Sequence, residues 1–123
     1  MDRTYHYIKF DRMGEIFCVG LTKTQIEDHQ MDDFGAELSR LLDVENCKKM
    51  VLQLGPEDPD FLISLFLAKL INLQRRLTSA GGALALCDLS ELTRDMFRIA
   101  GIEKFFRFYP DKESAIHALT PMT

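Results

Sequence analysis

The sequence predicts an α/β fold with a mixed, mainly parallel sheet of about five strands and about four helices. Short apolar runs alternate along the chain with longer segments of helical periodicity, as in strands joined by crossover helices. Two apolar segments near the start are separated by a single turn, which indicates an antiparallel hairpin at one sheet edge. The length of 123 residues suits one domain, so we expect a single domain over residues 1–123.

The chain is expected to open with this hairpin. Residues 5–10 alternate between apolar and polar side chains, as in a strand with one buried face. Residues 11–14 (Asp-Arg-Met-Gly) have the composition of a turn. Residues 16–19 (Ile-Phe-Cys-Val) form a continuous apolar run, which is typical of a strand covered on both faces.

A helix and a buried strand follow the hairpin. The helix is expected near residues 32–43, where Asp32 and Asp33 suit the positive amino end. Its apolar face consists of Phe34, Leu38, Leu41 and Leu42. Residues 50–54 are predicted to be a short buried strand, because they are apolar and end at the helix-breaking segment 55–60.

The second helix is expected from about Phe61 to Ser79, with Asp60 as its cap and Gly81-Gly82 after its end. Its first three turns are apolar nearly all round, whereas a surface helix shows one apolar stripe. Two interpretations remain open: the helix is covered on both sides, or its free side is a docking patch. Residues 83–87 are predicted to be the next buried strand.

A third helix is predicted after Ser90, which suits the capping position. Its apolar residues Leu92, Met96, Ile99 and Ala100 share one face. Gly101 can take the left-handed conformation after the last turn, and Ile102 is then expected to pack back on Phe97.

The chain is expected to end with a strand at residues 105–109 and a helix that starts at Pro110-Asp111. Ile116 and Leu119 of this helix point inward. The predicted order is therefore β-β-α-β-α-β-α-β-α, with parallel strands joined by right-handed crossovers.

Charge and hydropathy exclude two classes of partner. The net charge is −4 and there is no dense Lys/Arg run, so we expect no nucleic-acid binding. The longest uncharged run has 11 residues, 77–87, whereas a membrane span needs about 20. Residues 1–6 lack the apolar core of a signal peptide, so we expect a cytoplasmic protein without membrane contact.

The three cysteines are consistent with a reducing compartment, because they cannot all pair and form no C-x-x-C motif. Cys18 and Cys87 lie in apolar runs and are expected in the core. Cys47 lies in a polar stretch and is expected to be exposed.

The usual catalytic constellations are absent from the sequence. No glycine-rich loop opens a helix, and no serine has the context of a nucleophile elbow. His6, His29 and His117 form none of the usual metal-binding pairs. We therefore expect no catalytic residues, no metal and no cofactor, and a protein that is not an enzyme.

Several segments in the second half share a pattern with a known family. They are residues 70–77 (LINLQRRL), 81–90 (GGALALCDLS), 101–106 (GIEKFF) and 108–116 (FYPDKESAI), together with Arg94 and Phe97. In this order they resemble the STAS domain of anti-sigma factor antagonists. The likeness extends over about residues 15–119 and has the predicted element order.

The resemblance implies a STAS-like fold and a regulatory protein that acts by protein–protein binding. In that family an unphosphorylated antagonist binds an anti-sigma factor, which is also a serine kinase, and so frees the sigma factor. The phosphate acceptor lies in a D-S-[ST]-G motif at the start of the second helix. In this sequence the four positions of the motif are occupied by Ile63, Ser64, Leu65 and Phe66. Only the serine is kept, which makes Ser64 the candidate phosphoacceptor.

These departures favour constitutive binding without the usual serine phospho-switch. A phosphate adds about −1.5 to −2 charges, and acidic side chains already surround the expected start of this helix. The residues expected to bind a partner are Asp58, Asp60, Leu62, Leu65 and Phe66. The expected partner is an anti-sigma factor/serine kinase, another signalling protein, or a second copy of the chain. Two alternatives stay open: a phosphorylation-switched antagonist that uses Ser64, and a STAS-like domain that binds a small ligand.

Overall fold

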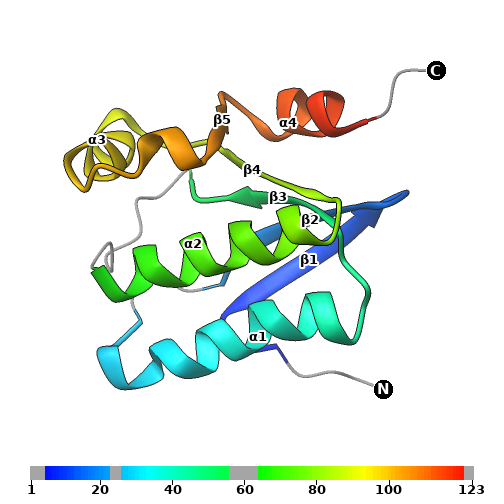
Figure 1. The fold of residues 1–123 in the computed structure, drawn as a ribbon, viewed down its shortest axis with the longest axis horizontal. Helices are drawn as coiled ribbons and strands as arrows, with labels where there is room; N and C mark the ends of the chain where they lie inside the picture. Colours follow the sequence, from blue (N-terminus) through cyan, green and yellow to red (C-terminus); the bar gives the residue numbers. More distant parts are fainter. Residues whose placement is uncertain (1–4, 23–25, 56–63, 121–123) are drawn as a thin grey trace.

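Five strands form one sheet in the computed structural model, in the order β1-β2-β3-β4-β5 (Figure 1). The structure describes residues 5–22, 26–55 and 64–120. The strands are β1 (Ile8–Met13), β2 (Ile16–Leu21), β3 (Lys49–Gln53), β4 (Ala83–Cys87) and β5 (Arg107–Tyr109). β1 pairs antiparallel with β2, and every later pair is parallel. The predicted mainly parallel sheet with an antiparallel edge is confirmed.

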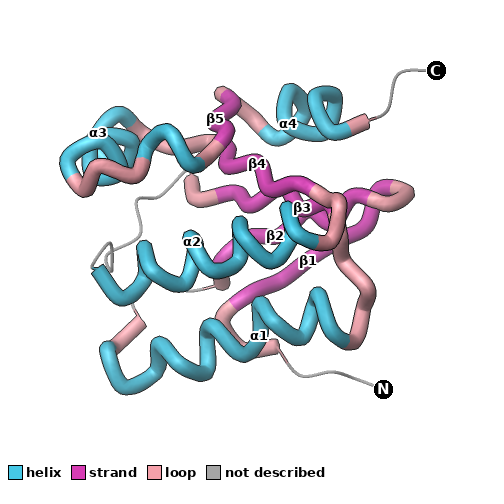
Figure 2. Tube along the Cα trace, viewed as in Figure 1, coloured by secondary structure: helices cyan, strands magenta, loops and turns pink. Residues whose placement is uncertain are grey.

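Helices cover both faces of this sheet (Figure 2). They are α1 (Met31–Asp43), α2 (Ser64–Ser79), α3 (Glu91–Ile99) and α4 (Lys112–Leu119). α1 and α2 lie side by side on one face, and α4 packs on the other. Two short 3-10 turns are present, η1 (Asp28–Gln30) and η2 (Glu103–Phe105). Within the described residues, the element order matches the prediction.

The core has one layer on each side of the sheet. Between the sheet and α1 and α2 lies a large cluster of Phe, Leu, Met and Ile side chains. A smaller cluster under α4 consists of Ile16, Cys18, Val51, Ala85, Cys87, Ala115 and Leu119. Each large apolar side chain buried here contributes about 1.5–3 kcal/mol to folding. The continuous apolar strands of the sequence therefore serve two layers at once.

A buried carboxylate joins the start of the described chain to α1. Glu37 accepts hydrogen bonds from the backbone N–H of His6, at 2.7 Å, and from that of Tyr7, at 2.9 Å. Its side chain is buried, yet these two donors compensate the loss of water. The contact fixes the segment that leads into β1.

The first hairpin differs from its prediction in position. β1 ends at Met13 rather than near residue 10, and Met13 pairs with Ile16 across a two-residue turn. Gly14 lies in this turn at φ +63°, a conformation that glycine adopts without steric cost. The glycine therefore sets the turn, and residues 11–13 extend the strand instead.

The apolar face predicted for α3 points to solvent. Leu92 and Ile99 are 64% and 78% exposed, while Thr93 and Phe97 are buried. The ending of α3 is as predicted. Gly101 has φ +75°, and the N–H of Ile102 donates to the carbonyl of Phe97 at 3.1 Å.

Two further predictions needed correction: the exposure of Cys47 and the length of the last strand. Cys47 is buried, because the chain after α1 turns inward and its N–H donates to the carbonyl of Leu41 at 2.9 Å. β5 is shorter than predicted, because Phe105 belongs to η2. Cys18 and Cys87 are buried as predicted.

Among the described residues, none of the helices combines the length and the apolar character that crossing a membrane requires.

Candidate functional site

The candidate site lies at the edge of the sheet where β3 and β4 end and where α2 and α3 begin (Figure 1). Two hydrogen bonds join the ends of these strands. The side-chain amide of Gln53 donates to Asp88 Oδ2 at 2.9 Å, and the N–H of Leu54 donates to the carbonyl of Cys87 at 3.1 Å. A Cβ at Gly55 would lie 1.9 Å from the carbonyl oxygen of Asp88, so only glycine fits there. The base of the site is therefore closely packed.

Some of the predicted site residues lie within the described part of the chain and others do not. Asp58, Asp60 and Leu62 lie outside the described residues. Ser64 is the first residue of α2, and its side chain is also outside the description. Leu65 is 42% exposed and so remains available to a partner.

The prediction that Phe66 binds a partner needs correction. Phe66 is fully buried in the core between the sheet and α1, where its ring lies 5.6 Å from that of Phe34, centroid to centroid. Successive residues of a helix point about 100° apart, so a helix that exposes Leu65 turns Phe66 inward. Phe66 therefore does not anchor a partner in this conformation.

The apolar character of α2 reflects packing on two sides. Five of its residues are buried against the sheet and α1: Phe66, Leu67, Leu70, Leu73 and Leu77. The sequence left open whether α2 is covered on both sides or has a free docking side. For these five residues the helix is covered on both sides. Leu65 is the large apolar residue of α2 that is exposed in the described part of the helix.

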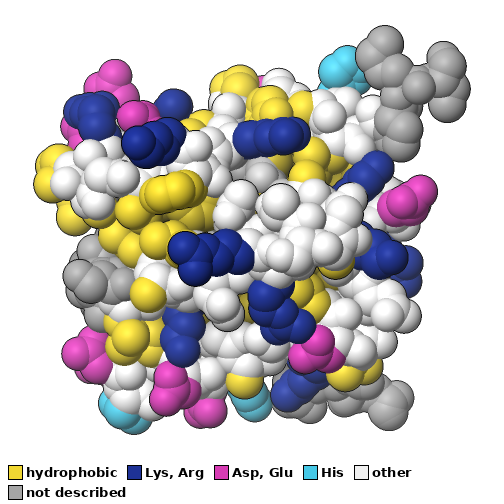
Figure 3. Space-filling view, in the orientation of Figure 1, with side chains coloured by type: hydrophobic (Ala, Val, Ile, Leu, Met, Phe, Trp, Pro, Cys, Tyr) yellow, Lys and Arg dark blue, Asp and Glu magenta, His cyan; other side chains and the backbone are white. Residues whose placement is uncertain are grey.

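A larger exposed apolar surface lies on α3 and η2. We call Leu92, Ile99 and Phe105 the α3 surface; their exposed fractions are 64%, 78% and 49%. Figure 3 shows apolar side chains gathered over this part of the molecule. Exposed apolar residues that cluster in this way are typical of a protein-binding surface.

Sequence reasoning did not assign the α3 surface to a partner, although a signal was present. The predicted packing of Ile102 on Phe97 already defines the inner side of α3. Leu92 and Ile99 lie on a different side of the same helix, so this helix has apolar residues beyond those that its core contact needs.

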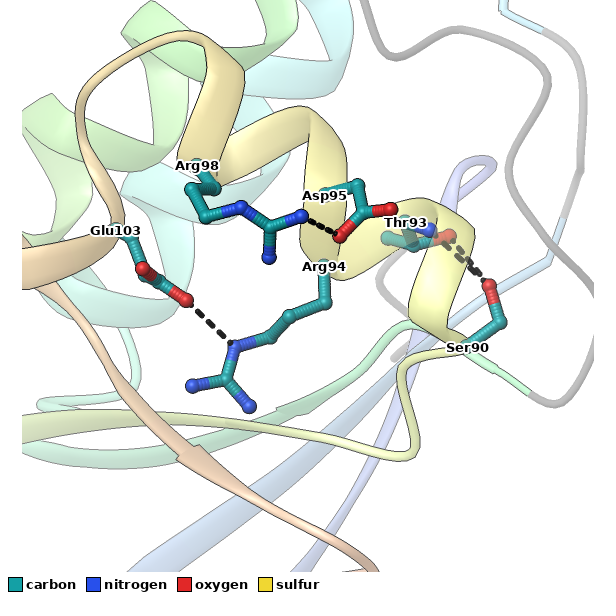
Figure 4. Close-up of polar contacts among 6 residues, drawn as sticks. All are labelled: Ser90, Thr93, Arg94, Asp95, Arg98 and Glu103. Carbon is teal, nitrogen blue, oxygen red and sulfur yellow. Dashed lines mark hydrogen bonds and ion pairs between the residues drawn. The ribbon is translucent and has the colours of Figure 1, made fainter.

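Next to the α3 surface is a hollow of about 260 Å³. It is lined by Leu89, Ser90, Glu91, Arg94, Phe108, Tyr109 and Pro110. The guanidinium of Arg94 lies 4.0 Å from the ring centroid of Phe108, and its Nε lies 3.3 Å from Glu103 Oε2 (Figure 4). Small-molecule sites usually have volumes of about 300–1,000 Å³, so this hollow is small for one.

Three charged residues on α3 form ion pairs, either with each other or with η2. Arg98 forms an ion pair with Asp95, and Arg94 forms the one with Glu103 (Figure 4). At the start of the helix, Ser90 Oγ accepts a hydrogen bond from the N–H of Thr93 at 3.1 Å, as its predicted capping role requires. The Arg94–Glu103 pair therefore links α3 to η2, while the other two contacts stabilise the helix itself.

The thiols are poor nucleophiles. Burial raises the pKa of Cys47 and of Cys87 to about 12, and burial also raises the pKa of Cys18. A thiol with such a pKa is protonated at neutral pH and so lacks the reactive thiolate. Among the described residues, no group of three or more His, Cys, Asp or Glu side chains is placed to hold a metal ion.

No family model matches the sequence. The fold does match solved structures. The anti-sigma-factor antagonist (STAS) domain protein from Planctomyces limnophilus superposes with a TM-score of 0.76, over 92% of this chain and 97% of that one, at 16% identity. This chain has the STAS-like fold.

Two further solved structures have this STAS-like fold. An anti-sigma factor antagonist from Mycobacterium paratuberculosis matches with a TM-score of 0.76, at 17% identity, over 91% of this chain and 92% of that one. The phosphorylated form of the Bacillus cell fate determinant SpoIIAA matches with a TM-score of 0.66, at 17% identity, over 92% of this chain and 99% of that one. The predicted α/β architecture is thereby confirmed as STAS-like.

Proposed function

We propose that this STAS-like chain is a cytoplasmic, non-enzymatic regulatory protein of the anti-sigma factor antagonist type. Its partner is an anti-sigma factor with serine kinase activity or a related signalling protein. The observation that carries the proposal is the α3 surface, where Leu92 and Ile99 are more than half exposed on a well-packed fold. The solved structures with the same fold are named as anti-sigma factor antagonists, which supports the choice of partner.

The chemistry of the α3 surface suits a protein more than a small molecule. Leu92, Ile99 and Phe105 are aliphatic or aromatic, and each contributes about 1.5–3 kcal/mol when fully buried. Paired charges from Arg94 and Arg98 lie beside them. Apolar anchors inside a polar rim are the usual arrangement of a binding interface.

Substituting Leu92→Asp or Ile99→Asp should weaken partner binding at least about tenfold, because a carboxylate would have to be buried in the interface. Both side chains are exposed, so the fold should remain intact. The measurement is calorimetric titration of the purified chain with the purified anti-sigma factor of the same cell.

The matched control for this titration is Val44→Asp. Val44 is 61% exposed and follows α1, in another part of the fold. We expect this variant to bind like the wild type. Equal affinity of all four proteins would show that the α3 surface is not the interface.

We propose further that binding does not depend on a phosphate at Ser64. The family motif is reduced to this serine, with Ile63 before it and Leu65 after it. Phosphate would also add about −1.5 to −2 charges at a position that Asp58 and Asp60 closely precede in the sequence.

Incubation of the wild-type chain with the cognate kinase and MgATP should leave its intact mass unchanged. A Ser64→Ala variant, treated in the same way, is the control for phosphate at other positions. One added phosphate in the wild type and none in the variant would instead support the switched antagonist.

A further inference from the structure

Among the described residues, the outer side of β1 is an open sheet edge. β1 is the first strand in the sheet order and pairs only with β2 in the described residues. Met13 and Ile16 flank a two-residue turn and therefore form a hydrogen-bonded pair. At the other end of the strand, the N–H of Thr22 donates to the carbonyl of Tyr7 at 3.0 Å. This alternation turns the N–H and C=O groups of Ile8, Phe10 and Arg12 away from β2.

We propose that this edge pairs with β1 of a second copy of the chain, antiparallel, with Phe10 on the two-fold axis. A two-fold axis perpendicular to the sheet places one residue opposite its own copy. With Phe10 in that position, Ile8 lies opposite Arg12 of the second copy, and Lys9 lies opposite Asp11. About six backbone hydrogen bonds would then join the two sheets into one.

Charge selects this register over its neighbours. Lys9 and Asp11 are exposed, and neither has an ion pair within the described residues. In the register centred on Phe10 they form two complementary pairs across the axis. Registers centred on Lys9, Asp11 or Arg12 place two like charges opposite each other, which is unfavourable. Charged side chains usually protect an edge strand from pairing; here they favour the pairing centred on Phe10, because it forms two complementary ion pairs.

The side chains on both faces of the strand permit this pairing. Lys9 lies on the same face as Gly20, where the missing side chain leaves room for its flexible stem. On the opposite face, Phe10 stacks on Phe17, with 5.6 Å between the two ring centroids, and is half-buried. Two Phe10 rings would meet at the axis and bury their exposed parts against each other.

Sedimentation equilibrium of the full chain tests the proposal. The wild type should form dimers in a concentration-dependent manner. Lys9→Asp places a carboxylate opposite Asp11 of the second copy, and Asp11→Lys places an ammonium group opposite Lys9. Each single variant should therefore dimerise at least about tenfold more weakly. An equimolar mixture of the two should restore dimers, because each chain then meets opposite charges.

The double variant Lys9→Asp/Asp11→Lys should dimerise like the wild type, since both complementary pairs return with their signs reversed. Glu15→Lys, an equally exposed change in the adjoining turn, is the control and should leave dimerisation unchanged. A wild type that stays monomeric at millimolar concentration would overturn the proposal. So would a mixture of the two single variants that forms no mixed dimer.

Self-association through β1 is independent of the proposed partner surface. If Leu92→Asp removes the dimer and Asp11→Lys does not, the second copy binds the α3 surface and the β1 pairing is wrong. If Asp11→Lys removes the dimer while anti-sigma factor binding persists, the edge pairing stands by itself.

Discussion

Phe66→Ala should lower the free energy of unfolding by about 3–5 kcal/mol. Phe66 is fully buried, and its ring contacts Phe34 of α1 while the rest of α2 packs against the sheet. Alanine would leave a cavity at the junction of α1 and α2, because the surrounding core cluster limits local collapse. Urea unfolding followed by circular dichroism measures the loss.

Leu65→Ala is the matched control for this cavity. Leu65 precedes Phe66 in the same helix but is 42% exposed, so we expect a change of less than about 1 kcal/mol. An unchanged stability in Phe66→Ala, together with lost partner binding, would contradict the core position of Phe66. It would restore the role that the sequence suggested for this residue.

Glu37→Ala should cost about 3 kcal/mol of unfolding free energy. The substitution removes the carboxylate that accepts from the N–H groups of His6, at 2.7 Å, and Tyr7, at 2.9 Å, and the second of these contacts is buried. Glu37→Gln keeps one carbonyl oxygen but presents an amide to the second donor. We therefore expect it to be intermediate in thermal and urea unfolding.

Asp33→Ala is the control on the same helix. Asp33 is exposed in the first turn of α1, where its charge interacts with the helix dipole, and its loss should cost less than about 1 kcal/mol. Equal effects of the Glu37 and Asp33 substitutions would mean that the buried carboxylate does not hold the start of β1.

The fold class was predictable because its determinants are local. The run Ala83–Cys87 was predicted with its observed bounds, since an apolar strand between a glycine pair and an aspartate has few other interpretations. α1 was predicted to within one residue because Phe34, Leu38 and Leu41 repeat at helical spacing. In both cases, residues close together in the sequence determine which side chains are buried.

The parts that sequence reasoning missed depend on distant contacts. Glu37 is buried only because His6 and Tyr7, about 30 residues earlier, bring two donors to it. Phe66 is buried because α1 packs beside α2 on the same face of the sheet, which the sequence of α2 alone does not determine. The exposure of Leu92 follows likewise from the position of Phe97 against the sheet.

The central claim is that a partner protein binds the α3 surface. The most direct measurement is the change in backbone amide NMR signals of the wild-type chain when the purified anti-sigma factor is added. We expect the largest changes in Glu91–Ile99 and in Glu103–Phe105, and near the start of α2, with little change in Met31–Asp43. Changes confined to α1, or no change at saturating partner, would contradict the claim.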